Sequence, residues 1–536
     1  CFKSIPLFIV LSLFTFSTVM AGEWQIIGPR ALGMGGANVA VANDATASYW
    51  NPAAFGFFGK RPAGFTSPEA FDQLIQDIGK RDYSQRDWSI VLNAGGTTLI
   101  HGDLGEALNE ITKFNFTTLT PPGGQISADK VSDFLQLLNA LRSFDANKNR
   151  AVTILANGVL TTQIGHFGIG GYAILDVSAK GDLDLVNISP VSTGTTGVNV
   201  IDQFSDTTAN NLNGGTPVPA GDHFFDAGTK NTLVTSIAAL PGWSTVTATN
   251  YVQAVDFGLS QSTTPVPPDI TTGIISAAEL ASNAQTGNSF ADNQSSLLFK
   301  GIAVGEIPIT YGVAVTEGLA IGGNIKYMKA RVYNKSINVF DRTFTNALDL
   351  ALDDYVDSVN YGIDIGILYR LGNNLRIGVV GRNLNSPDFD MKKVLPTDPD
   401  KFEETPQVRA GFAIRPVSFI TLAADIDLTK NETTIGNNFK SQTVGGGVEI
   451  DLFRFLQLRA GAFKNFAEDD IGLVYTAGLG LNFWLLNFDI GAALSRERTR
   501  LEIFENDSQD DLYQLVGLSD DLPEDFRVEF ALSMLF

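Results

Sequence analysis

The sequence is poor in the residue types that build most catalytic centres. Its 536 residues include one cysteine and three histidines. Cys1 precedes an apolar stretch that we expect to be removed, so the mature chain should have no disulfide and no thiolate chemistry. His101, His166 and His223 do not have the spacing of metal ligands, and we find no Gly-x-Ser-x-Gly nucleophile elbow. We therefore expect a protein that is not an enzyme and that uses no cofactor and no metal ion.

Long apolar runs are also missing beyond the first residues. No later stretch holds about 18 or more consecutive apolar residues, which argues against membrane-spanning helices.

Basic residues are few, with 37 Lys and Arg against 58 Asp and Glu, so the net charge is −21. Such an acidic chain is a poor partner for nucleic acid.

The first residues have the pattern of a secretion signal. Lys3 supplies a basic start, an apolar stretch runs from Ile5 to Phe16, and the small-residue pattern Val19-Met20-Ala21 precedes Gly22. We expect residues 1–21 to be a signal peptide that is cleaved, and we exclude them from the fold.

Alternation of apolar and polar residues dominates the rest of the chain. At the end of the sequence, Phe526, Val528 and Phe530 lie on one face of a predicted strand and Arg527 and Glu529 on the other. This pattern recurs in 14 segments: 86–95, 149–162, 165–178, 307–315, 318–333, 358–370, 375–384, 406–415, 417–429, 438–452, 454–465, 471–483, 485–496 and 525–536.

The links between these segments alternate between short and long. Short turns and long outer loops, with an even number of strands, are typical of outer-membrane barrels. We predict an all-β protein, a 14-stranded antiparallel transmembrane β-barrel over residues 61–536, in the outer membrane of a Gram-negative-type bacterium. Its extracellular insertions should lie at about 96–148 and 179–306, and helical spacing at 103–113 and 127–144 predicts a helical pair over the outer mouth.

Charged residues on the inward face of the predicted strands carry both signs. Buried charges are costly unless they are hydrated, paired or hydrogen-bonded, so the wall should be wet, ion-paired or bonded to a plug. The predicted lumen wall includes Asp364, Arg376, Arg382, Asp425, Glu449, Arg459, Asp489 and Arg527. The acidic loop at 497–524 could bind Ca²⁺, but it has no regular ligand spacing and a solvated face is the simpler interpretation.

Residues 28–54 read GPRALGMGGANVAVANDATASYWNPAA. The glycines do not form a dinucleotide fingerprint, because Asn38 stands where the third glycine is needed and no βαβ pattern surrounds them. Few charges and many small residues predict a compact, irregular segment in a confined space.

The elements RALGMGGA and DATASYWNPAA, which follow a signal peptide and precede a β-rich chain ending in Phe, resemble the FadL-type outer-membrane transporters of hydrophobic compounds. They are equally similar to barrels identified as TraF-like conjugal transfer proteins, and GRNLNSPDF at 381–389 resembles both groups. The FadL resemblance implies that residues 22–60 form a hatch inside the barrel. It assigns Asn51, Pro52 and Ala53 to a turn of the hatch, and Gly33, Gly35 and Gly36 to its packing.

Two functions are compatible with these observations. The first is passive uptake of hydrophobic small molecules, such as long-chain fatty acids, gated by the hatch. The second is a structural or assembly barrel of a secretion or conjugal transfer apparatus, with outer loops that dock a protein partner. In either case we expect a monomer surrounded by outer-membrane lipids, and in the first case a hydrophobic small-molecule ligand.

Overall fold

The structure is a computed structural model. It describes residues 22–58, 88–102, 150–184, 221–262, 270–283, 294–338, 354–371, 374–396, 398–436, 439–453, 455–483, 485–500 and 521–535, with Leu135, Ile201 and Val266. The predicted signal peptide at 1–21 and most of the acidic loop at 497–524 lie outside these residues. The predicted helical pair at 103–113 and 127–144 also lies outside them, apart from Leu135.

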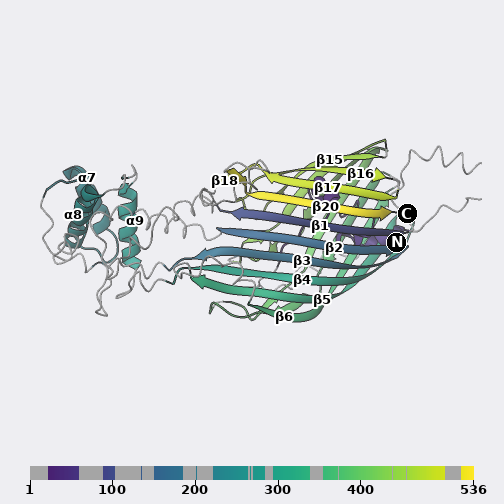
Figure 1. The fold of residues 1–536 in the computed structure, drawn as a ribbon, viewed down its shortest axis with the longest axis horizontal. Coiled ribbons are helices and arrows are strands. Elements are labelled where there is room, and N and C mark those ends of the chain that lie inside the picture. Colours follow the sequence, from purple (N-terminus) through teal and green to yellow (C-terminus); the bar gives the residue numbers. More distant parts are fainter. Residues whose placement is uncertain are drawn as a thin grey trace, which may run out of the picture.

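A closed antiparallel barrel of 14 strands forms most of the described structure (Figure 1). The first strand pairs with the last, from Ser89 opposite Leu535 to Leu99 opposite Asp525, so the sheet has no free edge. Each predicted strand overlaps a different strand of the observed barrel, and the predicted fold class is confirmed. In order around the barrel the strands are β1 (Trp88–His101), β2 (Ala151–Ile164), β3 (Phe167–Asp182), β4 (Ser296–Ala314), β5 (Leu319–Asn338), β6 (Tyr355–Leu371), β7 (Leu375–Arg382), β10 (Gln407–Val417), β11 (Ile420–Asp427), β14 (Thr443–Leu452), β15 (Leu456–Asn465), β16 (Val474–Phe483), β17 (Leu486–Ser495) and β20 (Asp525–Leu535).

The two faces of the wall follow the alternation in the sequence. On β6, the predicted outward residues Ile365 and Ile367 are 51% and 48% exposed, whereas the predicted inward residue Asp364 is 1% exposed. Tyr361 pairs with Tyr327 of β5 near one edge of this apolar band, and Tyr369 lies near the other edge. Tyrosines at the edges of an outward apolar band are typical of transmembrane barrels.

The strands β4 and β5 extend further than predicted. The start of β4 lies at Ser296, whereas the prediction placed it at residue 307. The added part contains Leu297, Leu298 and Phe299 in succession, so it has no period of two that a sequence pattern could reveal. Pairing with β5, which continues to Asn338, holds it in the sheet.

Small hairpins fold from the long links. They consist of β8 (Asp388–Asp390) with β9 (Lys401–Glu403), β12 (Asn431–Glu432) with β13 (Lys440–Ser441), and β18 (Arg498–Arg500) with β19 (Asp521–Pro523). The period-two analysis did not predict them because each strand has only two or three residues.

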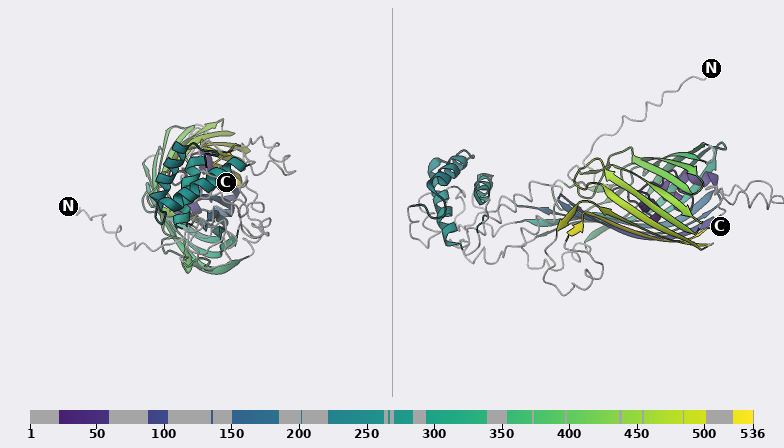
Figure 2. Two further views of the ribbon diagram at one scale, coloured as in Figure 1. Left: turned by 90° about the vertical axis from the view of Figure 1, so that its left-hand side faces the viewer. Right: turned by 90° about the horizontal axis from the view of Figure 1, so that it is seen from above.

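Three helices form a separate unit beyond the long-loop end of the barrel (Figures 1 and 2). They are α7 (Ala227–Ala238), α8 (Thr245–Gln261) and α9 (Ile270–Asn283). Asp226 caps α7 by accepting from the amide of Thr229, and Ser244 caps α8 through a capping box with Thr247. The sequence predicted an extracellular excursion at 179–306 but no helices within it. None of the described helices is both long enough and apolar enough to cross a bilayer.

Candidate functional site

Residues 22–58 lie inside the barrel, and we call this segment the hatch. It contains α1 (Pro29–Gly33), α2 (Ala47–Trp50) and the 3₁₀ helix η1 (Pro52–Phe57). The helix α1 contacts β16, β17 and β20, and η1 contacts β4, β5 and β6, so the hatch reaches across the lumen to opposite parts of the wall. Nearly all of its residues are buried.

Close backbone approach explains the glycines of the hatch. A Cβ on Gly33 would lie 3.0 Å from the Cα of Gly478 in the wall. Gly35 has φ +67°, and a Cβ there would collide with the backbone oxygens of Gly446 and Ala462. Gly36 has φ +80° and lies against Ile26 of the hatch itself. Gly33 and Gly35 allow the hatch backbone to touch the wall without intervening side chains, and Gly36 allows a close contact within the hatch.

The Asn-Pro-Ala turn joins the hatch to the opposite wall. The side chain of Asn51 accepts from the amide of Ala53 at 3.1 Å and donates to the carbonyl of Ile367 in β6 at 3.2 Å. Pro52 packs against Gly322 so closely that a side chain at residue 322 would meet its carbonyl. The wall thus supplies glycines where the hatch supplies a rigid turn. Inward glycines on paired strands are a sequence signal that could have predicted where the hatch touches the wall.

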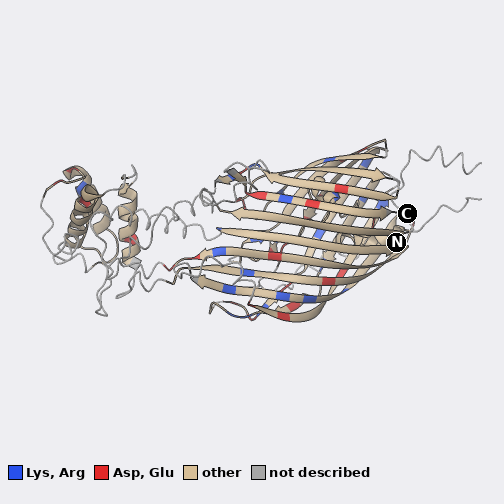
Figure 3. Cartoon of the chain, viewed as in Figure 1, with Lys and Arg blue, Asp and Glu red and all other residues tan. Residues whose placement is uncertain are grey.

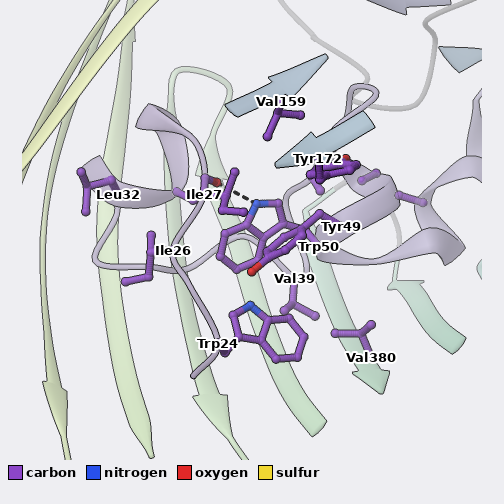
Figure 4. Close-up of a cluster of buried hydrophobic side chains, with 14 of the residues drawn as sticks. Trp24, Ile26, Ile27, Leu32, Val39, Tyr49, Trp50, Val159, Tyr172 and Val380 are labelled. Atoms are coloured by element: carbon purple, nitrogen blue, oxygen red, sulfur yellow. Dashed lines mark hydrogen bonds between the residues drawn. The ribbon is translucent and has the colours of Figure 1, made fainter. Parts of the chain in front are cut away.

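An aromatic cluster forms the centre of the hatch (Figure 4). Trp50 donates from its indole Nε1 to the carbonyl of Ile27 at 3.0 Å, and Tyr49 stacks on Tyr172 of β3 at 5.8 Å between ring centroids. The guanidinium of Arg382 in the wall lies 3.9 Å from the ring centroid of Tyr49. A cation over an aromatic face in a buried site is a favourable contact, which the sequence analysis did not predict.

One network of charges links the hatch to the wall at β14 and β15. Arg30 of the hatch binds both carboxylate oxygens of Glu449, each at 2.9 Å. Arg459 donates to the same carboxylate at 2.8 Å and to Asp489 at 2.5 Å. The inward charges here are therefore paired, and Arg30 of the hatch supplies one of the partners.

Figure 3 shows charged residues of both signs along the strands of the barrel. The other predicted wall residues lie on the lumen side, where Asp364, Asp425 and Arg527 are buried. Asp425 accepts from the backbone amides of Asn38 and Val39 at 2.7 and 2.9 Å. Asp364 lies 3.3 Å from the amine of Lys326. Arg527 donates twice to Asp525 at 2.8 Å, and Arg376 borders a small cavity beside Val41.

An apolar patch interrupts this polar lining on the long-loop side of the hatch. We call it the inner apolar patch, and it joins the inward faces of β4 and β5 to the β8–β9 hairpin. Its members are Ile302, Val304, Met328, Ala330, Val332, Phe389, Met391 and Phe402, with Ile174 beside them. The sequence analysis missed it because it assigned polar residues to the inward face and did not predict the hairpin.

The link that carries the hairpin is fastened to the wall by Asp398. This carboxylate accepts from Lys300 of β4 at 2.6 Å and from the amides of Val394 and Leu395. Burial by itself would raise the pKa of Asp398, but the Leu395 amide and Lys300 outweigh it and lower the pKa to about 2. The hairpin is therefore held over the inner apolar patch at neutral pH.

Cavities adjoin the hatch on both sides. One of about 200 Å³ on the short-turn side is lined mainly by polar residues, among them Asn93, Asp451 and Asn482. Another, of about 20 Å³, lies between the hatch and the inner apolar patch and touches Tyr49, Ile174 and Val304. The aromatic cluster packs against inward residues of the wall, and η1 contacts β4, β5 and β6. Within the described ranges, no group of three or more His, Cys, Asp or Glu side chains is arranged to hold a metal ion.

The fold and its outward apolar band define a β-barrel of the outer-membrane type whose lumen holds an N-terminal plug. Residues 186–427 match the family model described as "F plasmid transfer operon, TraF, protein". No curated protein matches the sequence.

Among solved structures, the chain is similar to the toluene transporter TbuX of Ralstonia pickettii, with 10% identity and a TM-score of 0.43 over 96% of this chain and 99% of that one. For the toluene transporter TodX of P. putida, the identity is 12% and the TM-score 0.40, again over 96% and 99%. A FadL homologue of Pseudomonas aeruginosa gives 10% and 0.41 over 97% and 99%. Both groups that the sequence resembles thus recur here.

Proposed function

We propose that the protein lets hydrophobic small molecules cross the outer membrane passively, through a lumen gated by the hatch. The observation that carries this proposal is the inner apolar patch, which places Val304, Met328 and Phe402 inside a lumen whose lining is otherwise largely polar. An apolar surface that leads toward Tyr49 of the hatch suits a guest that water and charged side chains reject.

Two movements are required for passage. Within the inner apolar patch, Phe389 and Phe402 of the β8–β9 hairpin pack against residues of the wall. A guest of several carbon atoms must therefore displace these two side chains from the wall. The hatch fills the lumen below, so η1 or the aromatic cluster must shift to open a route toward the polar cavity on the short-turn side. Part of the hatch–wall contact is polar, as at Arg30 and Asp425, and these groups can exchange partners with water when the hatch shifts.

Uptake by cells tests the proposal. Cells that produce the protein should accumulate a labelled monoaromatic hydrocarbon or a long-chain fatty acid faster than cells with an empty vector. Phe402→Lys should reduce this uptake about tenfold, because it places a charge in the apolar path, and Phe402→Leu should retain most of it. Gel mobility before and after heating checks that both variants form the barrel. Equal uptake with and without the protein for every apolar compound would reject the transport function.

A specific observation supports the second candidate function, a barrel that docks a partner in a transfer or secretion apparatus. The match to the TraF family model spans the helical unit as well as β4 to β11. Replacement of residues 221–283 with a short Gly-Ser linker separates the two functions. A transporter should keep its uptake, whereas a docking barrel should lose a stoichiometric partner that co-purifies with the full-length chain.

A further inference from the structure

Gly22 occupies an unusual position for a residue so close to the predicted cleavage point. It is buried inside the barrel, and a Cβ built on it would lie 3.3 Å from Oδ2 of Asp176 and 3.4 Å from Oε1 of Glu404. The side chain of Gln407 donates to its carbonyl at 2.8 Å and holds the residue in place. Gly22 therefore lies between two carboxylates, one on β3 and one on the link between β9 and β10.

These carboxylates are buried without a positive partner in direct contact. Asp176 is 2% exposed and accepts from the hydroxyl of Thr434 and the amide of Glu23. Glu404 is 8% exposed and accepts from the side-chain amide of Asn383 at 3.1 Å. In the part of the chain that the structure describes, no Lys, Arg or His forms an ion pair with either of them. Burial, with the nearby Glu306, raises the pKa of Glu404 to about 7.

The cavity beside Gly22 is small and is lined by hydrogen-bond acceptors. The cavity here holds about 20 Å³, which is space for roughly one water molecule and not for a metabolite. Gln25 also lines it, and its buried side-chain oxygen has no hydrogen-bond partner. A site with surplus buried acceptors needs a compact donor that carries positive charge. The small volume excludes a bulky ligand, and the nearest source of a compact cationic donor is the chain itself at Gly22.

We propose that cleavage of the peptide bond between Ala21 and Gly22 creates this donor, and that the new α-ammonium binds Asp176 and Glu404. Water adds across the bond, so Ala21 leaves with a carboxylate and Gly22 keeps the nitrogen as an ammonium group with three N–H donors. We call Gly22, Asp176 and Glu404 the N-terminal latch. The latch ties the hatch to the wall and to an outer link at one point. This inference depends on the predicted cleavage site and not on the transported substrate.

Analysis of the purified protein tests the latch first. N-terminal sequencing should give Gly22 as the first residue. A reagent selective for α-amines at pH 7 should label the folded protein at least tenfold more slowly than the unfolded protein, because the ammonium is buried and paired. Another N-terminal residue, or equal labelling rates in the two states, would overturn the proposal without any variant.

Variants then identify the partners. Asp176→Asn with Glu404→Gln should increase the labelling rate of the folded protein at least fivefold. Glu403→Gln is the matched control, because it removes the same charge from the adjacent residue, which does not border Gly22, and it should change nothing. Heat-modified gel mobility must show an intact barrel in each case. An unchanged rate in the double variant would contradict the assigned partners.

The position of the ammonium supplies a second test. One alanine inserted between Ala21 and Gly22 moves the charged group about 3.8 Å along the chain. Hydrogen exchange should become faster in residues 22–58 and stay unchanged in the barrel strands. The same insertion in the link between α7 and α8, at residues 239–244 of the helical unit, should leave the hatch unaffected. If exchange in the hatch does not change with the first insertion, the latch does not hold it.

Discussion

The barrel and the helical unit arrange polar and apolar residues in opposite ways. In the barrel, Ile365 is 51% exposed on the outside and Asp364 is 1% exposed on the inside. In the helical unit, Ile237 and Ile274 are fully buried, and Lys230 and Thr232 lie on or near its surface. One chain therefore builds two opposite patterns, because hydrocarbon surrounds one region and water surrounds the other.

The two regions also differ in the groups that bind their buried charged side chains. Charged side chains of the barrel strands pair mostly with other side chains, as in the contacts of Arg459 with Glu449 and Asp489, and the two amides that Asp425 accepts from belong to the hatch. In the helical unit, the buried Asp256 accepts mainly from three backbone amides, those of His223, Phe224 and Phe225, with Lys230 further away at 3.4 Å. A strand already uses its amides in the sheet, whereas the loop before α7 has amides to offer.

The largest expected effect comes from Arg459→Met in the barrel. It removes one partner from Glu449 and another from Asp489 and should lower the free energy of unfolding by about 3–5 kcal/mol. Urea titration in detergent or lipid measures it. Lys464→Met on the same strand is the control, because its partner Asp469 is 91% exposed and an exposed pair contributes about 0–1 kcal/mol. Similar losses in the two variants would refute the importance of burial here.

Ile237→Ala addresses the core of the helical unit. It should destabilise that unit by about 2–5 kcal/mol, because it leaves a cavity among Leu233, Trp243 and Ile274. Hydrogen exchange should quicken in α7, α8 and α9 and stay constant in the barrel strands. Faster exchange in the strands as well would show that the two regions unfold together.

Ile365→Arg and Val246→Arg compare two exposed apolar positions directly. Ile365 faces lipid and Val246, at 66% exposure, faces water at the start of α8. We expect a cost of about 2–4 kcal/mol at Ile365 if it lies near the midplane and less than about 0.5 kcal/mol at Val246. Refolding into lipid vesicles measures the first, with Ile365→Leu as the control for shape. Equal costs at the two sites would contradict the assignment of the lipid-facing surface.

The smallest expected effect is a loss of stability of the helical unit at low pH. Burial alone would raise the pKa of Asp256, but the amides of Phe225, Phe224 and His223 outweigh it and the pKa lies below 3.8. The stabilisation is therefore complete above the unfolded pKa near 4 and is lost as the pH falls through the lower folded value. Circular dichroism between pH 6 and pH 2 should show helix loss in the wild type while the strand signal persists. Asp256→Asn should weaken this pH dependence, and an unchanged profile would argue against the role of Asp256.

Prediction from sequence succeeded where one physical pattern governs a whole segment. The strand 358–370 is an example, because each outward residue meets hydrocarbon and each inward residue meets the lumen. It failed for α7 to α9, where Gly, Thr and Ser are frequent and the apolar face becomes evident only when three helices share a core. For the hatch, the residues alone indicated a compact segment, and its place inside the barrel came from a family resemblance.

What the sequence determined by itself is therefore the barrel: its number of strands, their order and, wherever the period of two holds, the side of the wall on which a residue lies. These features depend on neighbours along the chain and on the solvent at each face. The tertiary structure alone decided which inward charges meet which hatch groups, that the β8–β9 hairpin covers the inner apolar patch, and that Gly22 lies between Asp176 and Glu404. Those contacts join residues that are far apart in the sequence, so no local period records them.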